Sequence, residues 1–298
     1  MAKEESWIEA FPAMERGDLR ELRKAVDSGF REFSADFGPY IEAAFDPLLT
    51  FLIWSEKLLL NTPWFIVLAA LAAICWYGSK NIKVVIGVIV SFMLIGYFGM
   101  WENTMRTLSM ILVCTTLSIA FGMPLGILMA MSNKAQAIVT PILDVMQTMP
   151  SFVYLIPVVM LLGIGKVPGL IAVVIYAIPP LIRLTNLGIR LVDKEVLEAS
   201  DAFGASKRQK LFGVQIPLAL PNIMAGVNQT IMMALAMVVV ASMIGVKGLG
   251  QPVLKAINNQ QFFLGVMNGL AIVALAIIFD RVTQAYGLRI QKHRNKAH

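Results

Sequence analysis

The chain has 298 residues, of which 57% are hydrophobic and only 15% are charged. This balance is too apolar for an ordinary water-soluble domain, and it predicts an all-α integral membrane protein. The net charge of +6 is unevenly distributed, because residues 1–56 hold 6 Lys/Arg and 12 Asp/Glu, whereas residues 57–298 hold 19 and 7. Basic residues at the edges of membrane spans indicate orientation, so this charge does not predict nucleic-acid binding.

Cysteine and histidine are too sparse for a metal or redox site. Cys75 and Cys114 lie in separate apolar runs, where a free cysteine is usually a packing residue. His293 and His298 lie in the last residues of the chain, so no histidine inside the membrane can relay protons or bind a metal. We therefore expect neither catalytic residues nor metal ligands in this chain.

Residues 1–62 are predicted to form a polar, amphipathic and interfacial segment. Apolar residues recur there at helical spacing: Trp7, Phe11, Leu19, Leu22 and Val26. They predict an amphipathic helix that is interrupted near Pro12 and Gly17. Residues 46–61 are apolar, but Glu56 and the lysine after it interrupt them before the roughly 20 residues that a span needs. An interfacial helix is expected here, and an eighth span is the alternative.

Seven apolar runs are predicted to span the membrane: residues 63–79, 82–101, 105–131, 137–164, 167–189, 217–246 and 263–286. The first two make a peripheral region, residues 63–104, and the others make a transmembrane domain, residues 105–286. The basic tail, residues 287–298, is expected in the cytoplasm. Counting spans back from it places the charged segment 193–216 in the cytoplasm as well, and the N-terminus outside.

The charged segment reads as two short helices joined by a turn. Asp193 can cap the first helix, and Gly204 suits a left-handed turn that ends it. Ser206, followed three residues later by Gln209, forms a capping box for the second helix, which Pro217 is expected to stop. Considered by its helix and turn signals alone, the segment is either a docking element or a hairpin that lies on the bilayer.

The spacing within this segment decides between the two. Glu198-Ala199-Ser200 is followed by three residues and Gly204, then by nine residues, Val214, one residue and Ile216-Pro217. This pattern resembles the EAA motif of the permease subunits of type-I ATP-binding-cassette (ABC) importers. The resemblance implies a coupling helix that docks on an ATPase through Glu198, Ala199, Ser200, Phe203, Gly204 and Ala205.

The resemblance extends over roughly residues 64–286. The stretches 142–189, 233–254 and 277–284 look like the ProW-type permeases, which import glycine betaine, proline and related compatible solutes. This implies a multi-pass protein of the bacterial inner membrane with three kinds of partner: a second permease copy, two ATPase subunits and an extracytoplasmic solute-binding protein. Because the chain lacks the order G-x4-G-K-[ST], ATP and Mg are expected on the ATPase subunits and no cofactor on this chain.

Ionisable residues inside predicted spans are costly, so a paired or functional role is the default. Asp144 and Arg183 lie at similar depth, which allows a salt bridge between them, with a substrate or gating role as the alternative. Candidates for lining the pathway are Met149, Pro150 and Tyr154, and candidates for an outer gate are Ser242, Met243, Gly245, Gly248 and Gly250. Asp280 and Arg281, near the inner boundary, are interpreted as snorkelling side chains.

The sequence is compatible with two functions from different classes. The first is the permease subunit of an ABC importer for a compatible solute such as glycine betaine, choline or proline. The alternative is an ion-coupled secondary transporter, for which several buried acids or paired broken helices would be typical. Only Asp144 lies deep in a predicted span and no internal repeat is evident, so the sequence favours the importer subunit.

Overall fold

The computed structural model describes residues 13–295, with side chains described as far as residue 287. This part of the chain contains helices and no strand, which confirms the all-α fold class. Its helices are α1 (Arg16–Asn61), α2 (Trp64–Ser79), α3 (Ile82–Tyr97), α4 (Trp101–Met131), α5 (Asn133–Thr148), α6 (Leu155–Leu162), α7 (Lys166–Ala177), α8 (Pro179–Arg190), α9 (Lys194–Ala202), α10 (Lys207–Lys210), α11 (Ile216–Ala241), α12 (Gly250–Asn258) and α13 (Phe262–Asn295). Short 3-10 turns lie at Ser151–Tyr154 and Ser242–Ile244, and a π-turn lies at Leu211–Gln215.

Four helical segments of the described part are long and apolar enough to cross a membrane: Trp101–Met131, Lys166–Arg190, Lys207–Ile244 and Phe262–Gly287. The total rises to six if the bent pairs α1–α2 and α5–α6 each count as one span. The expected number of seven is therefore not confirmed. The span expected at 82–101 is missing even from the higher total, because α3 has 16 residues, about 24 Å of helix, which is short of the ~30 Å hydrocarbon layer.

The span predicted over residues 137–164 is sharply bent in the structure. The axis turns by 112° between Asn133–Thr148 and Ser151–Leu162. The cause is local, because Met149 precedes Pro150 and a residue before proline is pushed out of the helical region. Met149 accordingly has φ −69° and ψ 134°.

Helix α11 is the centre of the bundle, packing against α8, α7, α4 and α13. Its buried face carries small side chains, including Ala219, Thr230, Ala234 and Ala241, which are 0% exposed. Small residues let membrane helices approach closely, and close packing is what holds such helices together in lipid. The core therefore fixes α11 as the element against which the other spans are positioned.

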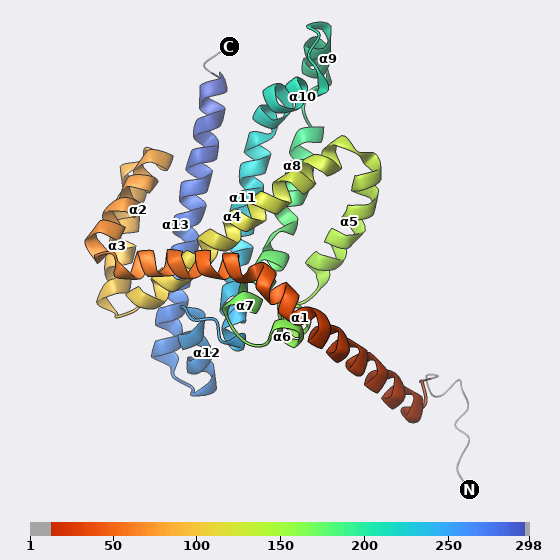
Figure 1. Ribbon diagram of the computed structural model, residues 1–298. Coiled ribbons are helices and arrows are strands. Elements are labelled where there is room, and N and C mark those ends of the chain that lie inside the picture. The colour runs from red at the N-terminus through yellow and green to blue at the C-terminus, as the bar shows by residue number, and fades with distance from the viewer. Residues whose placement is uncertain (1–12, 296–298) are drawn as a thin grey trace.

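The bundle has two distinct ends (Figure 1). Helices α9 and α10 lie at one end, where α13 also finishes, and α12 lies at the other; we call them the α9 end and the α12 end. Helix α1 lies crosswise to α11 and α13 and packs against α4, α6 and α7. Residues 46–61 thus do not run parallel to the spans, in line with the expected interfacial helix.

The ends of the chain differ in detail from expectation. Gly17 lies in the first turn of α1 and does not interrupt it, and Pro12 lies outside the described residues. Figure 1 shows α1 changing direction partway, which its internal prolines, Pro39 and Pro47, explain. The basic tail is not a separate segment over its whole length, because α13 continues as far as Asn295.

Candidate coupling and transport sites

The charged segment folds as the capped hairpin that its sequence predicts. Asp193 accepts a hydrogen bond from the amide of Glu195 at 3.0 Å and begins α9. Gly204 has φ +73° and turns the chain after α9, a conformation that costs side-chain-bearing residues energy. Ser206 and Gln209 form the reciprocal capping box that begins α10. Helix caps depend on neighbouring residues only, which is why the sequence was sufficient here.

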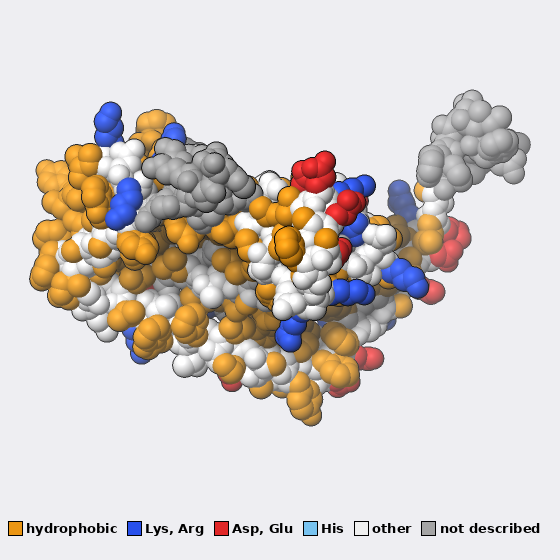
Figure 2. Space-filling view, turned by 90° about the horizontal axis from the view of Figure 1, so that it is seen from above, with side chains coloured by type: hydrophobic (Ala, Val, Ile, Leu, Met, Phe, Trp, Pro, Cys, Tyr) orange, Lys and Arg blue, Asp and Glu red, His pale blue; other side chains and the backbone are white. Residues whose placement is uncertain are grey.

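The hairpin projects from the α9 end of the bundle (Figure 1). No residue of α9 is buried, and Phe203 is 92% exposed. Glu198, Ala199 and Gly204 are exposed as well, while Ser200 and Ala205 are half-buried. Figure 2, which views the molecule from this end, shows acidic and basic side chains grouped toward its middle and a mostly hydrophobic flank at the left. The predicted docking residues thus form a free surface with an apolar knob and a charge.

The expectation that Pro217 stops the second helix is wrong. From Lys207 the helix runs through the π-turn of Leu211–Gln215 into α11 without a break. A proline ring would press on the carbonyl four residues earlier in a regular α-helix. Here the preceding turn is already wide, since the amide of Ile216 donates to the carbonyl of Leu211, and the helix can pass the proline.

The bend between α5 and α6 brings together one of the predicted pairs. Arg183 Nη2 on α8 donates to Asp144 Oδ1 on α5, and the two form an ion pair. The Asp144 side chain is 57% exposed and that of Arg183 is 35% exposed. The pair therefore ties the bent α5 to α8 while leaving one face of the carboxylate open.

Tyr154 fixes the bend from the inside. Its hydroxyl donates to the carbonyl of Met146 in the last turn of α5, a group that the end of the helix leaves without an intrahelical partner. Its ring meets that of Tyr176 edge-on, with centroids 5.8 Å apart. Met149 and Pro150 form the corner itself, and Pro150 is exposed.

The predicted gate residues follow α11 at the α12 end. Ser242 is buried and its hydroxyl donates to the carbonyl of Val239 at 2.6 Å. Met243 is 61% exposed, and Gly245 ends the 3-10 turn in the left-handed region with φ +86°. This segment is a turn of small residues with one exposed thioether.

The second half of this loop packs tightly against α4. The amide of Leu249 donates to the hydroxyl of Thr107 at 2.9 Å, and both groups are buried. A Cβ at Gly248 would lie 2.5 Å from the same hydroxyl, and one at Gly250 would lie 2.7 Å from Val239 Cα. Gly248 is thus required by close approach, and Thr107 is a member of the site that its place in a long apolar run did not reveal.

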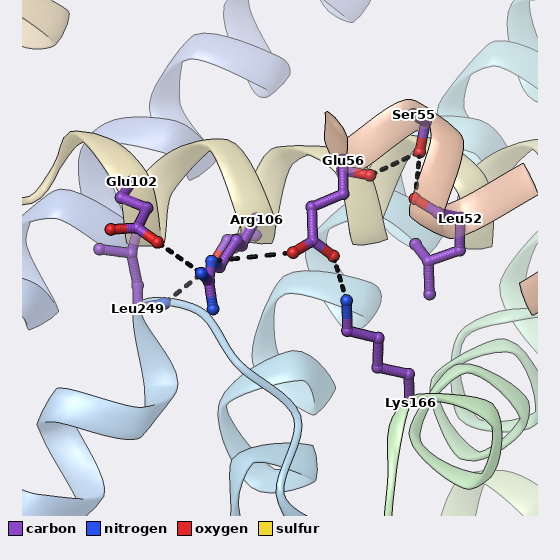
Figure 3. A network of polar contacts seen from close by, with 9 residues as sticks. Leu52, Ser55, Glu56, Glu102, Arg106, Lys166 and Leu249 are labelled. Carbon is purple, nitrogen blue, oxygen red and sulfur yellow. Dashed lines mark hydrogen bonds and ion pairs between the residues drawn. The ribbon is translucent and has the colours of Figure 1, made fainter. Parts of the chain in front are cut away.

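An ion cluster that joins α1 to α4 and α7 was also not predicted from the sequence (Figure 3). Glu56 of α1 pairs with Lys166 of α7 at 2.5 Å and with Arg106 of α4 at 3.7 Å. Glu102 contacts the same arginine from one turn earlier in α4. We call these four residues the Glu56 cluster. The sequence held the signal, because all four residues lie outside the predicted spans or at the end of one.

The interpretation of Asp280 as a snorkelling residue is wrong. Its Oδ1 accepts hydrogen bonds from the amide groups of Asn228 on α11, at 2.8 Å, and Gln284 on α13, at 2.6 Å. The hydroxyl of Thr283 donates to the side-chain oxygen of Asn228, Oδ1, at 2.6 Å. Asp280 is therefore part of a polar cluster between two spans, and Arg281 is exposed on another side of α13.

Metal and thiol chemistry find no support in the described residues. No group of three or more His, Cys, Asp or Glu side chains in this part of the chain could hold a metal ion. Cys75 and Cys114 are both buried and free, each among the apolar residues of the main core. They act in packing.

Apolar helices packed around a central helix, with a capped and exposed hairpin at one end, define an all-helical membrane protein. Residues 122–292 match the family described as "Binding-protein-dependent transport system inner membrane component". The chain belongs to this family, the permease subunits of ABC transporters.

The chain is similar to subunits of several transport systems. The chain is 47% identical over 278 residues to the glycine betaine/proline betaine transport system permease protein ProW of Escherichia coli (strain K12), covering 93% of this chain and 78% of the other. It is 47% identical to the glycine betaine/carnitine transport permease protein GbuB of Listeria monocytogenes, covering 75% and 80%. An inward-facing structure of the MetNI methionine ABC transporter has the same fold, with a TM-score of 0.53 at 20% identity over 62% of this chain and 92% of that one.

Proposed function

We propose that the chain is the permease subunit of an ATP-driven importer for small solutes that carry a methylated ammonium group, with glycine betaine foremost. The observation that carries this proposal is the 47% identity over 93% of the chain to a permease named for glycine betaine and proline betaine. A second relative is named for glycine betaine and carnitine. The solutes in these names share a methylated, positively charged nitrogen and a carboxylate.

The hairpin is the proposed docking element for the ATPase. Phe203 and Glu198 stand free on its surface, and small residues at 199, 200 and 202 let another protein approach closely. An apolar knob beside a charge suits a groove on a partner, because burial of the ring stabilises the contact and the charge orients it. In this arrangement the partner binds ATP and Mg in the cytoplasm, and the α9 end faces the cytoplasm.

The opposite end then faces outward and receives the solute. We propose that a solute-binding protein delivers its cargo to the α12 end, and that two copies of the chain enclose the pathway. The exposed ion pair of Asp144 and Arg183 supports the second point, because charged groups within a membrane face a partner or water rather than lipid. Met149, Pro150 and Tyr154 shape the pathway next to it, and the segment from Ser242 to Gly250 gates it.

The test is uptake by the reconstituted complex. The chain is purified with its ATPase and placed in liposomes with ATP inside and the solute-binding protein outside, and accumulation of radiolabelled glycine betaine is measured. We expect uptake that requires ATP and is inhibited by unlabelled proline betaine and carnitine. Uptake that proceeds without ATP on an imposed sodium or proton gradient would contradict the proposal and favour a secondary transporter.

A pair of phenylalanine variants tests the docking element within the same assay. Phe203→Ala removes the 92% exposed ring of the hairpin, and Phe262→Ala removes an 82% exposed ring at the α12 end. Neither ring is packed, so both variants should fold. We expect the ATPase to be lost on purification only with Phe203→Ala. Equal retention of the ATPase in both variants would show that the hairpin is not the docking element.

A further inference from the structure

A polar pocket lies between α11 and α13, separate from the docking and gate residues. Its volume is about 530 Å³, within the range of small-molecule sites. Amide, carboxylate and thioether side chains line it together with small apolar residues; the polar and sulfur-bearing ones include Met224, Asn228, Gln229, Met232, Asp280 and Gln284. Placing polar groups between membrane helices costs free energy, so polar side chains grouped around a cavity indicate a functional site.

The carboxylate of Asp280 is held in place but not neutralised. Asn228 and Gln284 both donate to Oδ1, while no hydrogen bond reaches Oδ2 in the described part of the chain. None of the ion pairs among the described residues includes Asp280. The pocket therefore contains one preoriented carboxylate whose Oδ2 is free to contact a cation.

The pocket opens on the exposed face of α11. Ala225 and Gln229 line it and are exposed. Seven residues after Gln229 comes Ala236, and seven after that Met243, and both are exposed as well. Residues seven apart lie on one face of a helix, so a single open face runs from the pocket to the proposed gate. The side of α11 that packs on α8 is the opposite one, because it carries buried Ala219 and Ile223.

We infer that this pocket is a transient binding site for the transported solute, with Asp280 facing its methylated ammonium group. The inference rests on the proposed function for the chemistry of that solute. A methylated ammonium cannot donate ordinary hydrogen bonds, so it is recognised by opposite charge and by soft apolar contacts, which Asp280, Met224 and Met232 provide. The side-chain amide of Gln229 can donate to the carboxylate of the same solute.

The test uses thiol reagents that imitate the cation. Cys75 and Cys114 are replaced by alanine, and Ala225→Cys places a thiol in the pocket of the permease–ATPase complex in nanodiscs. Its reaction rates are measured with two methanethiosulfonates, one carrying a trimethylammonium group and one a sulfonate. We expect the rate ratio, cationic over anionic reagent, to exceed the ratio for free cysteine by about tenfold or more, and we expect glycine betaine to slow the reaction.

Asp280→Asn removes the charge and keeps the size of the side chain. At the thiol of Ala225→Cys, the ratio of the rate with the cationic reagent to the rate with the anionic reagent should therefore fall toward the ratio for free cysteine. Asp280→Glu should retain it. The matched control is Ala236→Cys, on the same face of α11 but 11 residues further on, whose ratio should not respond to Asp280→Asn. Retention of the ATPase during purification shows that each variant is folded.

Three results would overturn the inference: a thiol at 225 that neither reagent reaches, a ratio that Asp280→Asn leaves unchanged, and a ratio at 236 that falls equally. In these cases the polar cluster only joins α11 to α13, and Asp280→Asn lowers thermal stability without affecting charge selectivity. ATP-dependent uptake of glycine betaine is measured separately. If uptake occurs without charge selectivity at 225, the proposed function stands and the pocket alone is refuted.

Discussion

Glu56 is predicted to hold α1 on the bundle, and the chain supplies its own control. Glu56 and Glu102 both contact Arg106, but they differ in setting. The Glu56 side chain is 13% exposed and joins three helices, whereas that of Glu102 is 65% exposed and contacts an arginine of its own helix. Glu56→Gln leaves the two cations, Arg106 and Lys166, facing each other with one exposed carboxylate nearby.

The expected cost follows from the burial of the cluster. Removing one partner of a fully buried ion pair costs about 3–5 kcal/mol. The side chains of Arg106 and Lys166 are 20% and 31% exposed. Water therefore screens part of the electrostatic energy that is lost when Glu56 is replaced. We therefore expect Glu56→Gln to weaken the attachment of α1 by about 2–3 kcal/mol, and Glu102→Gln, which breaks a surface pair within one helix, by about 0.5 kcal/mol or less.

Hydrogen exchange measures this attachment directly. Detachment of the last turns of α1 exposes the amides of residues 48–61, so their exchange rate reports the opening equilibrium. A loss of 2–3 kcal/mol corresponds to exchange about 30 to 150 times faster, and a loss of 0.5 kcal/mol to about twice as fast. Equal acceleration by Glu56→Gln and Glu102→Gln would refute the reasoning, because it would mean that the bridge between helices adds nothing to a local surface pair.

Three further outcomes are expected. Gly204→Ala should reduce ATPase retention and uptake together, because φ +73° is strained by about 1 kcal/mol for alanine, whereas Gly213→Ala, at ordinary φ in open space, should change neither; equal effects would exclude the turn as the cause. Asp144→Asn and Arg183→Gln should be non-additive in a double-mutant cycle for uptake, and additivity would argue against a working pair. Thr107→Val leaves a buried loop amide without an acceptor, so the melting temperature should fall by an amount equivalent to about 1–3 kcal/mol; no change would show that the loop is not held there.

Features that depend on adjacent residues could be predicted from the sequence. The hairpin is the clearest example, since its cap, its left-handed turn and its capping box each involve side chains within three residues of one another. The same is true of the proposed docking surface, where Phe203, Glu198 and the small residues between them lie on the exposed outside of the hairpin. Here local chemistry decides the structure.

Prolines were a less reliable guide to where helices break, because tertiary packing decides whether a helix bends at a proline. The Met149–Pro150 step breaks its helix, while the Ile178–Pro179 step does not, and Ile178 remains helical with φ −71° and ψ −32°. Pro179 is buried in the bundle, whereas Pro150 is exposed. Tertiary contacts hold α7 and α8 in line against the local preference, whereas at the corner the contact of Tyr154 with Met146 holds the bend.

Long-range contacts account for the residues that were missed. Glu56 meets a lysine 110 positions later, and Asp280 meets an asparagine 52 positions earlier. Each of these charges, taken alone, has a simpler explanation at a membrane boundary, as an interruption of an apolar run or as a snorkelling side chain. Only the packing of α1 on α7 and of α11 on α13 shows that they are satisfied within the protein.

A single helical element links the three parts of the site. Lys207–Ile244 runs as 38 residues, about 57 Å, from the hairpin to the turn that precedes the gate loop. Asn228 and Gln229, about midway, bring the pocket onto the same element. If an ATPase docks on the hairpin as proposed, a displacement of the hairpin would reach the pocket and the proposed gate without crossing a loop. The π-turn at Leu211–Gln215 and the left-handed Gly245 lie near its two ends, where the backbone departs from regular α-helix and could serve as a hinge. The element would then move as a rod between two hinges, and binding at one end would alter access at the other.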